Sequence, residues 1–199
     1  MVMSSTDGGV RHTGPAASSE RIAMNLDRVT TGNDVPHEIN VVIEIPMNSD
    51  PIKYELDKNT GAMFVDRFVS TSMHYPCNYG YIPHTIADDG DPVDVLVITP
   101  FPLQHGVVVR CRPLGVLQME DEAGGDSKLL AVPIDKCLPW YKHWQHAEDI
   151  APERLTQIQH FFEHYKDLEK GKWVKVLRWG GAEEAHRLIM ESIARAKKK

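Results

Sequence analysis

The amino-acid sequence predicts a mainly β, α+β fold: a closed antiparallel β-barrel with extra hairpins, flanked by two C-terminal α-helices. Three observations predict it. Short segments of alternating apolar residues recur between residues 39 and 134, turn residues separate them, and helical spacing is confined to the last quarter of the chain. Many short, evenly spaced strands are typical of a closed antiparallel barrel.

The strands are predicted from residues of one kind at every second position. Within 39–45, Val41, Ile43 and Ile45 share one face, and Lys53 and Glu55 share one face of the next strand. The other predicted strands span 63–69, 93–98, 107–112, 115–119 and 129–134. The turn residues between strands lie at 59–61, 100–102 and 120–125.

Two helices are predicted near the C-terminal end. Pro152 suits a first helical turn, and apolar residues recur at helical spacing from Leu155 to Tyr165 until Gly171 ends the run. The second helix is predicted over 182–196, where an apolar stripe includes Leu188.

The length of 199 residues corresponds to about one domain. Residues 1–36 are rich in Ser, Thr, Gly and Asp, which predicts a flexible N-terminal extension, with Met24 a candidate for the natural start. A single domain is expected over 37–199.

Composition excludes several classes of protein. A net charge of −6 argues against a nucleic-acid partner. No signal peptide is apparent, and no apolar run approaches the about 20 residues that span a bilayer, so no membrane partner is expected. The three cysteines lack metal-binding spacing and fit a reducing cytoplasm, which predicts a cytoplasmic protein.

The segment 88–94 is the strongest candidate for chemistry, with four carboxylates in seven residues. Such crowding is unfavourable unless a cation screens it, and hard oxygen ligands suit magnesium or calcium. A solvated acidic turn is the alternative. A calcium-binding EF-hand is excluded, because Asp94 stands where that loop needs glycine and Pro100 where it needs glutamate.

A second acidic loop covers 120–128, and a set of basic and phenolic residues accompanies both loops. Each member of this set has a structural alternative, but together cations facing a carboxylate-bound metal are suited to gripping a polyanion such as diphosphate. The set consists of Lys53, Arg67, Tyr75, Tyr79, Lys128, Tyr165 and Lys166. No phosphate-binding P-loop, cysteine-phosphatase motif or nucleophile elbow is present, so phosphoryl chemistry here requires metals and a positioned water.

The segment 89–95, Asp-Gly-Asp-Pro-Val-Asp-Val, resembles the D-x-D-P-x-D-[LV] signature of family I soluble inorganic pyrophosphatases of the bacterial type. The resemblance covers about residues 40–199. It includes the blocks 42–46, 50–55, 65–67, 75–81, 121–126 and 160–175.

This resemblance implies a five-stranded, OB-like barrel and an activity. Diphosphate would be hydrolysed to two orthophosphates by a hydroxide activated between Mg²⁺ ions, several per active site, without a covalent intermediate. It also implies a homo-oligomer, commonly a hexamer in bacterial relatives.

The resemblance also implies residue roles. Asp91 matches the proton acceptor. The metal ligands would be Asp89, Asp94, Asp121 and Asp126, with Glu44 acting through water. The residues gripping the two phosphates would be Lys53, Arg67, Tyr79, Lys128, Tyr165 and Lys166, and Glu55 and Tyr75 would line the cavity. Asp88 is an additional acid that many relatives lack.

Two rival functions are considered. The segment 89–93 also matches the D-x-D-x-[TV] motif of haloacid-dehalogenase-type phosphatases, in which Asp89 would be a covalent nucleophile. There the motif follows an apolar strand, whereas here the apolar strand 93–98 comes after it. The other rival is a non-catalytic barrel that binds a metal or ligand on its acidic loops.

Two histidine pairs have metal-binding spacing. His143 with His146, and His160 with His164, are able to bind a transition metal. A place in solvent or at a subunit interface is the favoured alternative, and the resemblance implies an interface position for His160 and His164.

Overall fold

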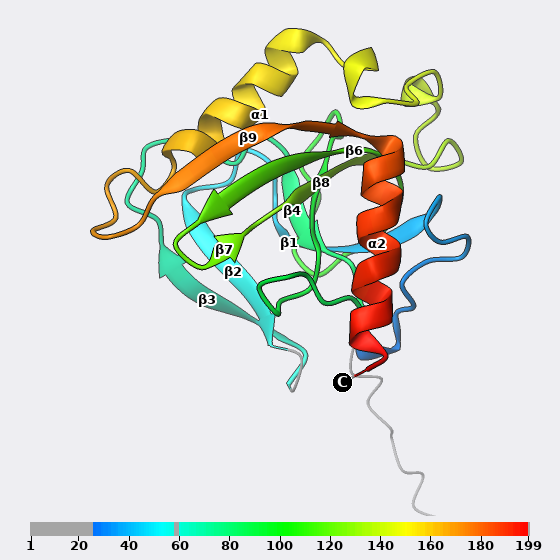
Figure 1. Ribbon diagram of the computed structural model, residues 1–199, viewed down its shortest axis with the longest axis horizontal. Coiled ribbons are helices and arrows are strands. Elements are labelled where there is room, and N and C mark those ends of the chain that lie inside the picture. Colours follow the sequence, from blue (N-terminus) through cyan, green and yellow to red (C-terminus); the bar gives the residue numbers. More distant parts are fainter. Residues whose placement is uncertain (1–25, 58–59, 199) are drawn as a thin grey trace, which may run out of the picture.

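The structure, a computed structural model, describes residues 26–57 and 60–198 (Figure 1). Short 3-10 helices lie at Leu26–Arg28, Pro139–Tyr141 and Ala147–Asp149. The strands are β1 (Ile39–Ile45), β2 (Ile52–Asp57), β3 (Ala62–Phe68), β4 (Asn78–Tyr81), β5 (Asp94–Val97), β6 (Val108–Asp121), β7 (Gly124–Gly125), β8 (Lys128–Pro133) and β9 (Val174–Gly181). The α-helices are α1 (Pro152–His164) and α2 (Ala182–Ala196).

Five strands form a ring of pairings. β1 pairs with β4, β4 with β5, β5 with β8, β8 with β6, and β6 returns to β1. The β5–β8 pairing is parallel and the others are antiparallel, so the sheet is ring-like and mixed. The predicted wholly antiparallel sheet is therefore wrong at this pair. The long strand β6 lies between β5 and β8 in the sequence and carries the chain back, so that β8 starts at the same end as β5.

Most predicted elements are confirmed, and the exceptions have local causes. The predicted strands 107–112 and 115–119 are one strand, β6, with an irregularity between Pro113 and Gly115. β4 was not predicted; its Gly80 lies so close to β1 that an added Cβ would meet the Val42 carbonyl oxygen at 2.0 Å. β9 was not predicted either, since its burial does not alternate cleanly.

The helices cover different faces of the ring, as Figure 1 shows. Successive β5 residues face two separate cores: Leu96 packs in the cluster that contains Phe162 of α1, and Val95 packs in the cluster that contains Ile189 of α2. α2 has its predicted bounds, but α1 ends at His164 rather than near Gly171. No helix of the described part of the chain has the length and apolar character needed to cross a membrane.

Residues 26–36 lie against the body of the protein. Leu26 is buried, and the Thr31 hydroxyl donates to the Pro83 carbonyl at 3.0 Å. The backbone N–H of Asn40 donates to the Thr31 carbonyl at 2.7 Å. The remainder of the predicted extension, including Met24, lies outside the described residues. The division at residue 36 stays a prediction.

Candidate active site

The first acidic loop connects β4 to β5 and is held by backbone hydrogen bonds. Gly90 adopts a φ of 95°, a left-handed conformation that glycine takes without strain. The Asp91 amide donates to Asp89 Oδ1 at 3.0 Å, and the Ala87 amide donates to the Asp91 carbonyl at 2.7 Å. Burial, with repulsion from neighbouring carboxylates, raises the pKa of Asp89. The loop thus presents its aspartates together just before β5 begins at Asp94.

The parallel register of β5 and β8 sets Asp94 opposite Lys128. The Lys128 ammonium contacts the carboxylates of both Asp94 and Asp126 and is only 4% exposed. Burial alone would lower the pKa of Lys128, but attraction by Asp94 and Asp126 outweighs burial and raises it. Lys128 is therefore a buried, charged group between two carboxylates.

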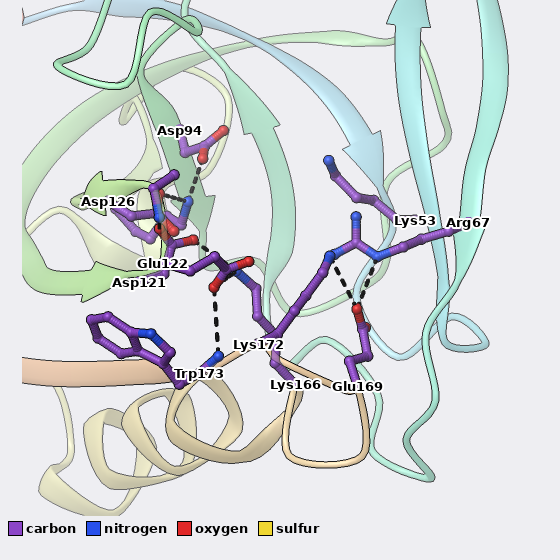
Figure 2. Close-up of polar contacts among 12 residues, drawn as sticks. Lys53, Arg67, Asp94, Asp121, Glu122, Asp126, Lys166, Glu169, Lys172 and Trp173 are labelled. Atoms are coloured by element: carbon purple, nitrogen blue, oxygen red, sulfur yellow. Dashed lines mark hydrogen bonds and ion pairs between the residues drawn. The ribbon is translucent and has the colours of Figure 1, made fainter.

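The second acidic loop forms the hairpin of β6 and β7. The Ala123 amide donates to Asp121 Oδ1 at 2.8 Å, and Lys166 Nζ lies 2.7 Å from Asp121 Oδ2 and 3.7 Å from Glu122 (Figure 2). Partial burial would raise the pKa of Asp121, but the hydrogen bond from Lys166 and the Ala123 amide lower it. Asp121 is accordingly an ionised carboxylate held at the loop.

The β2–β3 hairpin supplies two cations from adjacent strands, because its register pairs Lys53 with Arg67. Asp66 lies 3.2 Å from Lys53 Nζ and 2.8 Å from an Arg67 terminal nitrogen. Glu169 lies 3.5 Å from Arg67 Nε and 3.1 Å from Lys172 Nζ (Figure 2). Partial burial would raise the pKa of Asp66, but the charges and hydrogen bonds of Lys53 and Arg67 outweigh burial and lower it. These carboxylates hold the hairpin's cations at the site.

Glu44 on β1 is buried, with 7% of its surface exposed. The Leu56 amide of β2 donates to Glu44 Oε1 at 2.9 Å. Burial raises the pKa of Glu44 to about 7, although the Leu56 amide acts in the opposite direction. A buried carboxyl poised near neutrality is typical of functional sites.

Three buried tyrosines form the aromatic wall of the site. The Tyr75 and Tyr79 rings are 5.5 Å apart, and Lys128 Nζ lies 5.6 Å from the Tyr79 ring centroid. Lys166 Nζ lies 5.6 Å from the centroid of Tyr165. Burial raises the pKa of each of the three phenols, so they stay protonated at neutral pH and are able to donate hydrogen bonds.

Two adjoining cavities collect all the predicted site residues. The cavities share Lys53, Tyr79, Asp91 and Asp94 and so form one cleft. The larger, of about 240 Å³, is also lined by Arg67, Tyr75, Asp89, Asp121, Ala123, Asp126, Lys128, Phe162, Tyr165, Lys166 and Lys172. The smaller, of about 70 Å³, is also lined by Glu44, Glu55, Leu56, Tyr81 and Pro92. Residues from seven strands, from α1 and from the loops between these elements therefore converge on one place.

The donor chemistry of the cleft fits a hard divalent cation. Asp89, Asp94, Asp121 and Asp126 offer only carboxylate oxygens, the ligands that Mg²⁺ and Ca²⁺ prefer. The ammonium of Lys128 already lies between Asp94 and Asp126 as a stand-in positive charge. The site thus has the charge pattern that such a cation requires.

Four charged residues at the site were not singled out from the sequence: Asp66, Glu122, Glu169 and Lys172. The pairs of Asp66 with Lys53, of Glu169 with Arg67 and of Glu122 with Lys166 join separate segments of the chain, which no local pattern reveals. Lys172 pairs with Glu169, three positions away. The family resemblance could have indicated these residues, because all four lie in segments that carry it. Asp66 lies in 65–67, Glu122 in 121–126, and both Glu169 and Lys172 in 160–175.

Comparison with known proteins agrees with this arrangement. The model of the inorganic pyrophosphatase family matches residues 41–197. The chain is 62% identical over 176 residues to inorganic pyrophosphatase of Escherichia coli K12, covering 88% of this chain and 100% of the relative. It is 60% identical over 172 residues to the Xanthomonas campestris protein of that name, covering 86% and 97%.

Solved structures agree as well. An inorganic pyrophosphatase from Coxiella burnetii superposes with a TM-score of 0.82 at 53% identity, covering 84% of this chain and 99% of that one. The Thermus thermophilus inorganic pyrophosphatase gives a TM-score of 0.82 at 43% identity, covering 87% and 99%. The signature loop, the cleft and these matches together show that the chain belongs to the inorganic pyrophosphatase family.

Proposed function

We propose that this protein hydrolyses inorganic diphosphate to two orthophosphates, with Mg²⁺ as cofactor and without a covalent enzyme intermediate. The observation that carries the proposal is the 240 Å³ cleft, in which two carboxylate loops face the cations of a hairpin and of the α1–β9 connection. Metal-bearing carboxylates opposite lysine and arginine are suited to a substrate with a phosphate at each end. Membership of the family supports the same reaction.

Divalent cations would be held by Asp89, Asp94, Asp121 and Asp126, with Glu44 acting through water. When bound, magnesium supplies Lewis-acid activation of water and neutralises phosphate charge. The Lys128 ammonium, which contacts Asp94 and Asp126, would bind phosphate where a cation holds these two carboxylates.

Asp91 is the proposed proton acceptor. It lines both cavities, and its own amide is fixed by Asp89 Oδ1. These contacts support the proposal that the Asp91 carboxylate takes a proton from the attacking water and orients it. Proton transfer to a positioned base typically contributes about 10²–10⁴-fold to the rate.

The remaining residues grip the substrate. Lys53 and Arg67 approach from the hairpin, and Lys128 and Lys166 approach from the opposite wall. The Tyr79 and Tyr165 hydroxyls would add neutral donors, with Glu55 and Tyr75 completing the lining. Positioning and charge stabilisation supply most of the rate in phosphoryl transfer of this kind.

A release assay tests this function. Orthophosphate liberated from diphosphate is measured with and without millimolar Mg²⁺, beside para-nitrophenyl phosphate as a monoester. We expect strong magnesium-dependent turnover of diphosphate and a far lower kcat/KM for the monoester, because each lost charged hydrogen bond costs about 1.5–3 kcal/mol. Comparable kcat/KM values would favour the dehalogenase-type alternative, and no turnover of either would favour a binding barrel.

The proposal extends to three features of the whole protein. The ring of strands forms a closed, OB-like barrel, and the protein is a homohexamer located in the cytoplasm. Exposed apolar side chains on β3, Phe64 and Phe68, support self-association, and three unpaired cysteines suit a reducing compartment. Sedimentation velocity tests the assembly, which a monomeric species at micromolar concentration would contradict.

A further inference from the structure

A threonine hydroxyl is inserted between the chains that leave β4 and enter β5, at the base of the first acidic loop. The register of the two strands continues to Ile82 and Val93, where a regular antiparallel pair exchanges two backbone hydrogen bonds. One of them is formed, from the Ile82 N–H to the Val93 carbonyl at 3.0 Å. In place of the other, Thr85 Oγ1 accepts from the Val93 N–H at 3.0 Å and donates to the Ile82 carbonyl at 2.6 Å. The hydroxyl therefore widens the ladder by one oxygen atom just before Asp94.

This bridge lies away from solvent. Thr85 is only 4% exposed, and Ile82 and Val93 are fully buried. A hydroxyl accepts and donates at the same time, so one side chain pairs a buried N–H with a buried carbonyl. Valine has nearly the same shape as threonine but does neither. With valine at position 85, both backbone groups would be left unpaired, which is costly, or the two chains would close until they bonded directly.

The backbone around Thr85 is held in an unusual shape that presents this hydroxyl. His84 has a φ of 57°, a left-handed conformation that residues other than glycine rarely adopt. The Thr31 hydroxyl fixes the Pro83 carbonyl at 3.0 Å on one side, and the Ile86 N–H donates to α2 at 3.1 Å on the other. Strained backbone persists where its surroundings hold it, and it is concentrated at functional sites.

We infer that Thr85 is a positioning residue for the acidic face of the cleft. Thr85 is not one of the residues that line the cleft, but its hydroxyl fixes Val93, which is adjacent to Asp94 and two positions from Asp91. A shift of Val93 would move both carboxylates relative to β8, which carries Lys128. Thr85 thus sets the geometry of cation binding and of proton transfer without touching metal or substrate. The inference rests on the proposed function of the cleft.

Thr85→Val and Thr85→Ser test the inference. Magnesium affinity is measured directly by isothermal titration calorimetry, and kcat for diphosphate is measured at saturating Mg²⁺. We expect Thr85→Val to bind magnesium about tenfold or more weakly, as does loss of a group that supports metal ligands, and to keep a lowered kcat when saturated. Thr85→Ser keeps Oγ1 but loses a buried methyl group, so its Tm should fall while its magnesium affinity stays close to that of the wild type.

Thr99→Val is the matched control, because Thr99 follows the opposite end of the same strand, β5. Thr99 is 8% exposed, and its hydroxyl accepts from the Asn78 amide at 2.7 Å and donates to the Phe101 carbonyl. The same substitution there removes an equally buried hydroxyl, so it should lower Tm but leave magnesium affinity and kcat unchanged. Thr85→Ala, which lacks the hydroxyl and adds no bulk, should reproduce the loss seen in Thr85→Val and replaces it if the valine variant does not fold.

The outcomes separate this inference from the function on which it rests. Wild-type magnesium affinity in Thr85→Val and Thr85→Ala would overturn the inference, as would an equal loss of affinity in Thr99→Val or in Thr85→Ser. Failure of the wild type itself to hydrolyse diphosphate would instead contradict the proposed function. The calorimetric comparison of magnesium binding would still decide whether Thr85 positions the carboxylates.

Discussion

Asp91 and Asp94 are three positions apart, yet their surroundings differ. Asp94 begins β5 and contacts the buried ammonium of Lys128. Asp91 lies in the preceding loop, and its amide is held by Asp89. These surroundings support the proposed roles, cation binding for Asp94 and proton transfer for Asp91, and substitution by asparagine tests them separately.

We expect Asp94→Asn to weaken magnesium binding, because a neutral amide is a poorer ligand, and added magnesium should recover part of the activity. Asp91→Asn should lower kcat by about 10²–10⁴-fold, as loss of a general base does, and magnesium should not restore it. Its residual rate should rise toward alkaline pH. The measurement is kcat against pH and magnesium for both variants and for Asp89→Asn.

Asp89→Asn should behave like Asp94→Asn. Acid quenching during turnover gives the decisive control, since no phosphorylated aspartate should be trapped. A phosphoryl group on Asp89, or magnesium rescue of Asp91→Asn, would contradict the proposed mechanism.

Glu44 makes the stability of the metal-free protein depend on pH. Burial raises its pKa from the ordinary 4.5 to about 7, so the folded state holds a proton that the unfolded state has lost between these values. The contribution of protonated Glu44 to the free energy of unfolding is present in full below pH 4.5 and is lost as pH rises through about 7. It amounts to about 3 kcal/mol.

Urea unfolding in the presence of a chelator, from pH 5 to pH 8, measures this effect. We expect the free energy of unfolding of Glu44→Gln to fall less across that range than that of the wild type. Glu191→Gln changes an exposed glutamate of α2 and should retain the wild-type slope. Identical slopes for the wild type and Glu44→Gln would show that Glu44 titrates normally.

At the scale of elements, the end of α2 holds the first acidic loop. The Ile86 amide donates to the Ser192 carbonyl at 3.1 Å, and Arg195 Nε donates to the Ile86 carbonyl at 2.8 Å. Arg195 also pairs with Asp88 at 3.1 Å, but Asp88 is 79% exposed in its side chain. Exposed ion pairs contribute little, so the contacts with Ile86 are the stronger restraint.

Arg195→Gln should therefore weaken the apparent magnesium affinity by about three- to tenfold, because only part of the about 1.5–3 kcal/mol of a hydrogen bond from a charged donor is transmitted to the loop. Its kcat at saturating magnesium should stay close to that of the wild type, because Arg195 does not line the cleft. Asp88→Asn is the matched variant and should change the affinity less than about twofold. Magnesium titrations of turnover decide between them, and equal effects would mean that the Asp88 pair, rather than Ile86, positions the loop.

At the scale of the molecule, the cleft places many carboxylates together, and they repel one another when no cation is bound. A cation that binds only the folded state stabilises it, by about 2.7 kcal/mol at one hundred times its Kd. For a chain of this size, that corresponds to a rise in Tm of about 5–10 °C.

Calorimetry with and without millimolar Mg²⁺ measures this rise. Ca²⁺ should also stabilise the fold but support little turnover, because its longer and looser coordination misplaces the water. Asp94→Asn should show a smaller rise in Tm with magnesium. An unchanged Tm for the wild type would count against an assembled cation site.

The sequence by itself determined what depends on local patterns. Alternation predicted β1, short apolar runs predicted β5 and β8, and the apolar stripe predicted α2. The signature 89–95 placed three aspartates together, on one loop and at the start of the strand that follows it. Those features are visible because neighbouring residues set the conformation of a strand, a helix or a glycine-containing turn. The resemblance to a family then indicated the distant members of the cleft.

Only the tertiary structure decided which distant segments meet. It made the β5–β8 pairing parallel, which sets Asp94 beside Lys128, and it brought Glu169 to Arg67 of the β2–β3 hairpin. It also added β4 and β9, whose short or irregular patterns carry no strong local signal. Such pairings are selected by the packing of the whole chain, because the free energy that favours them comes from burial and charge between residues far apart in sequence.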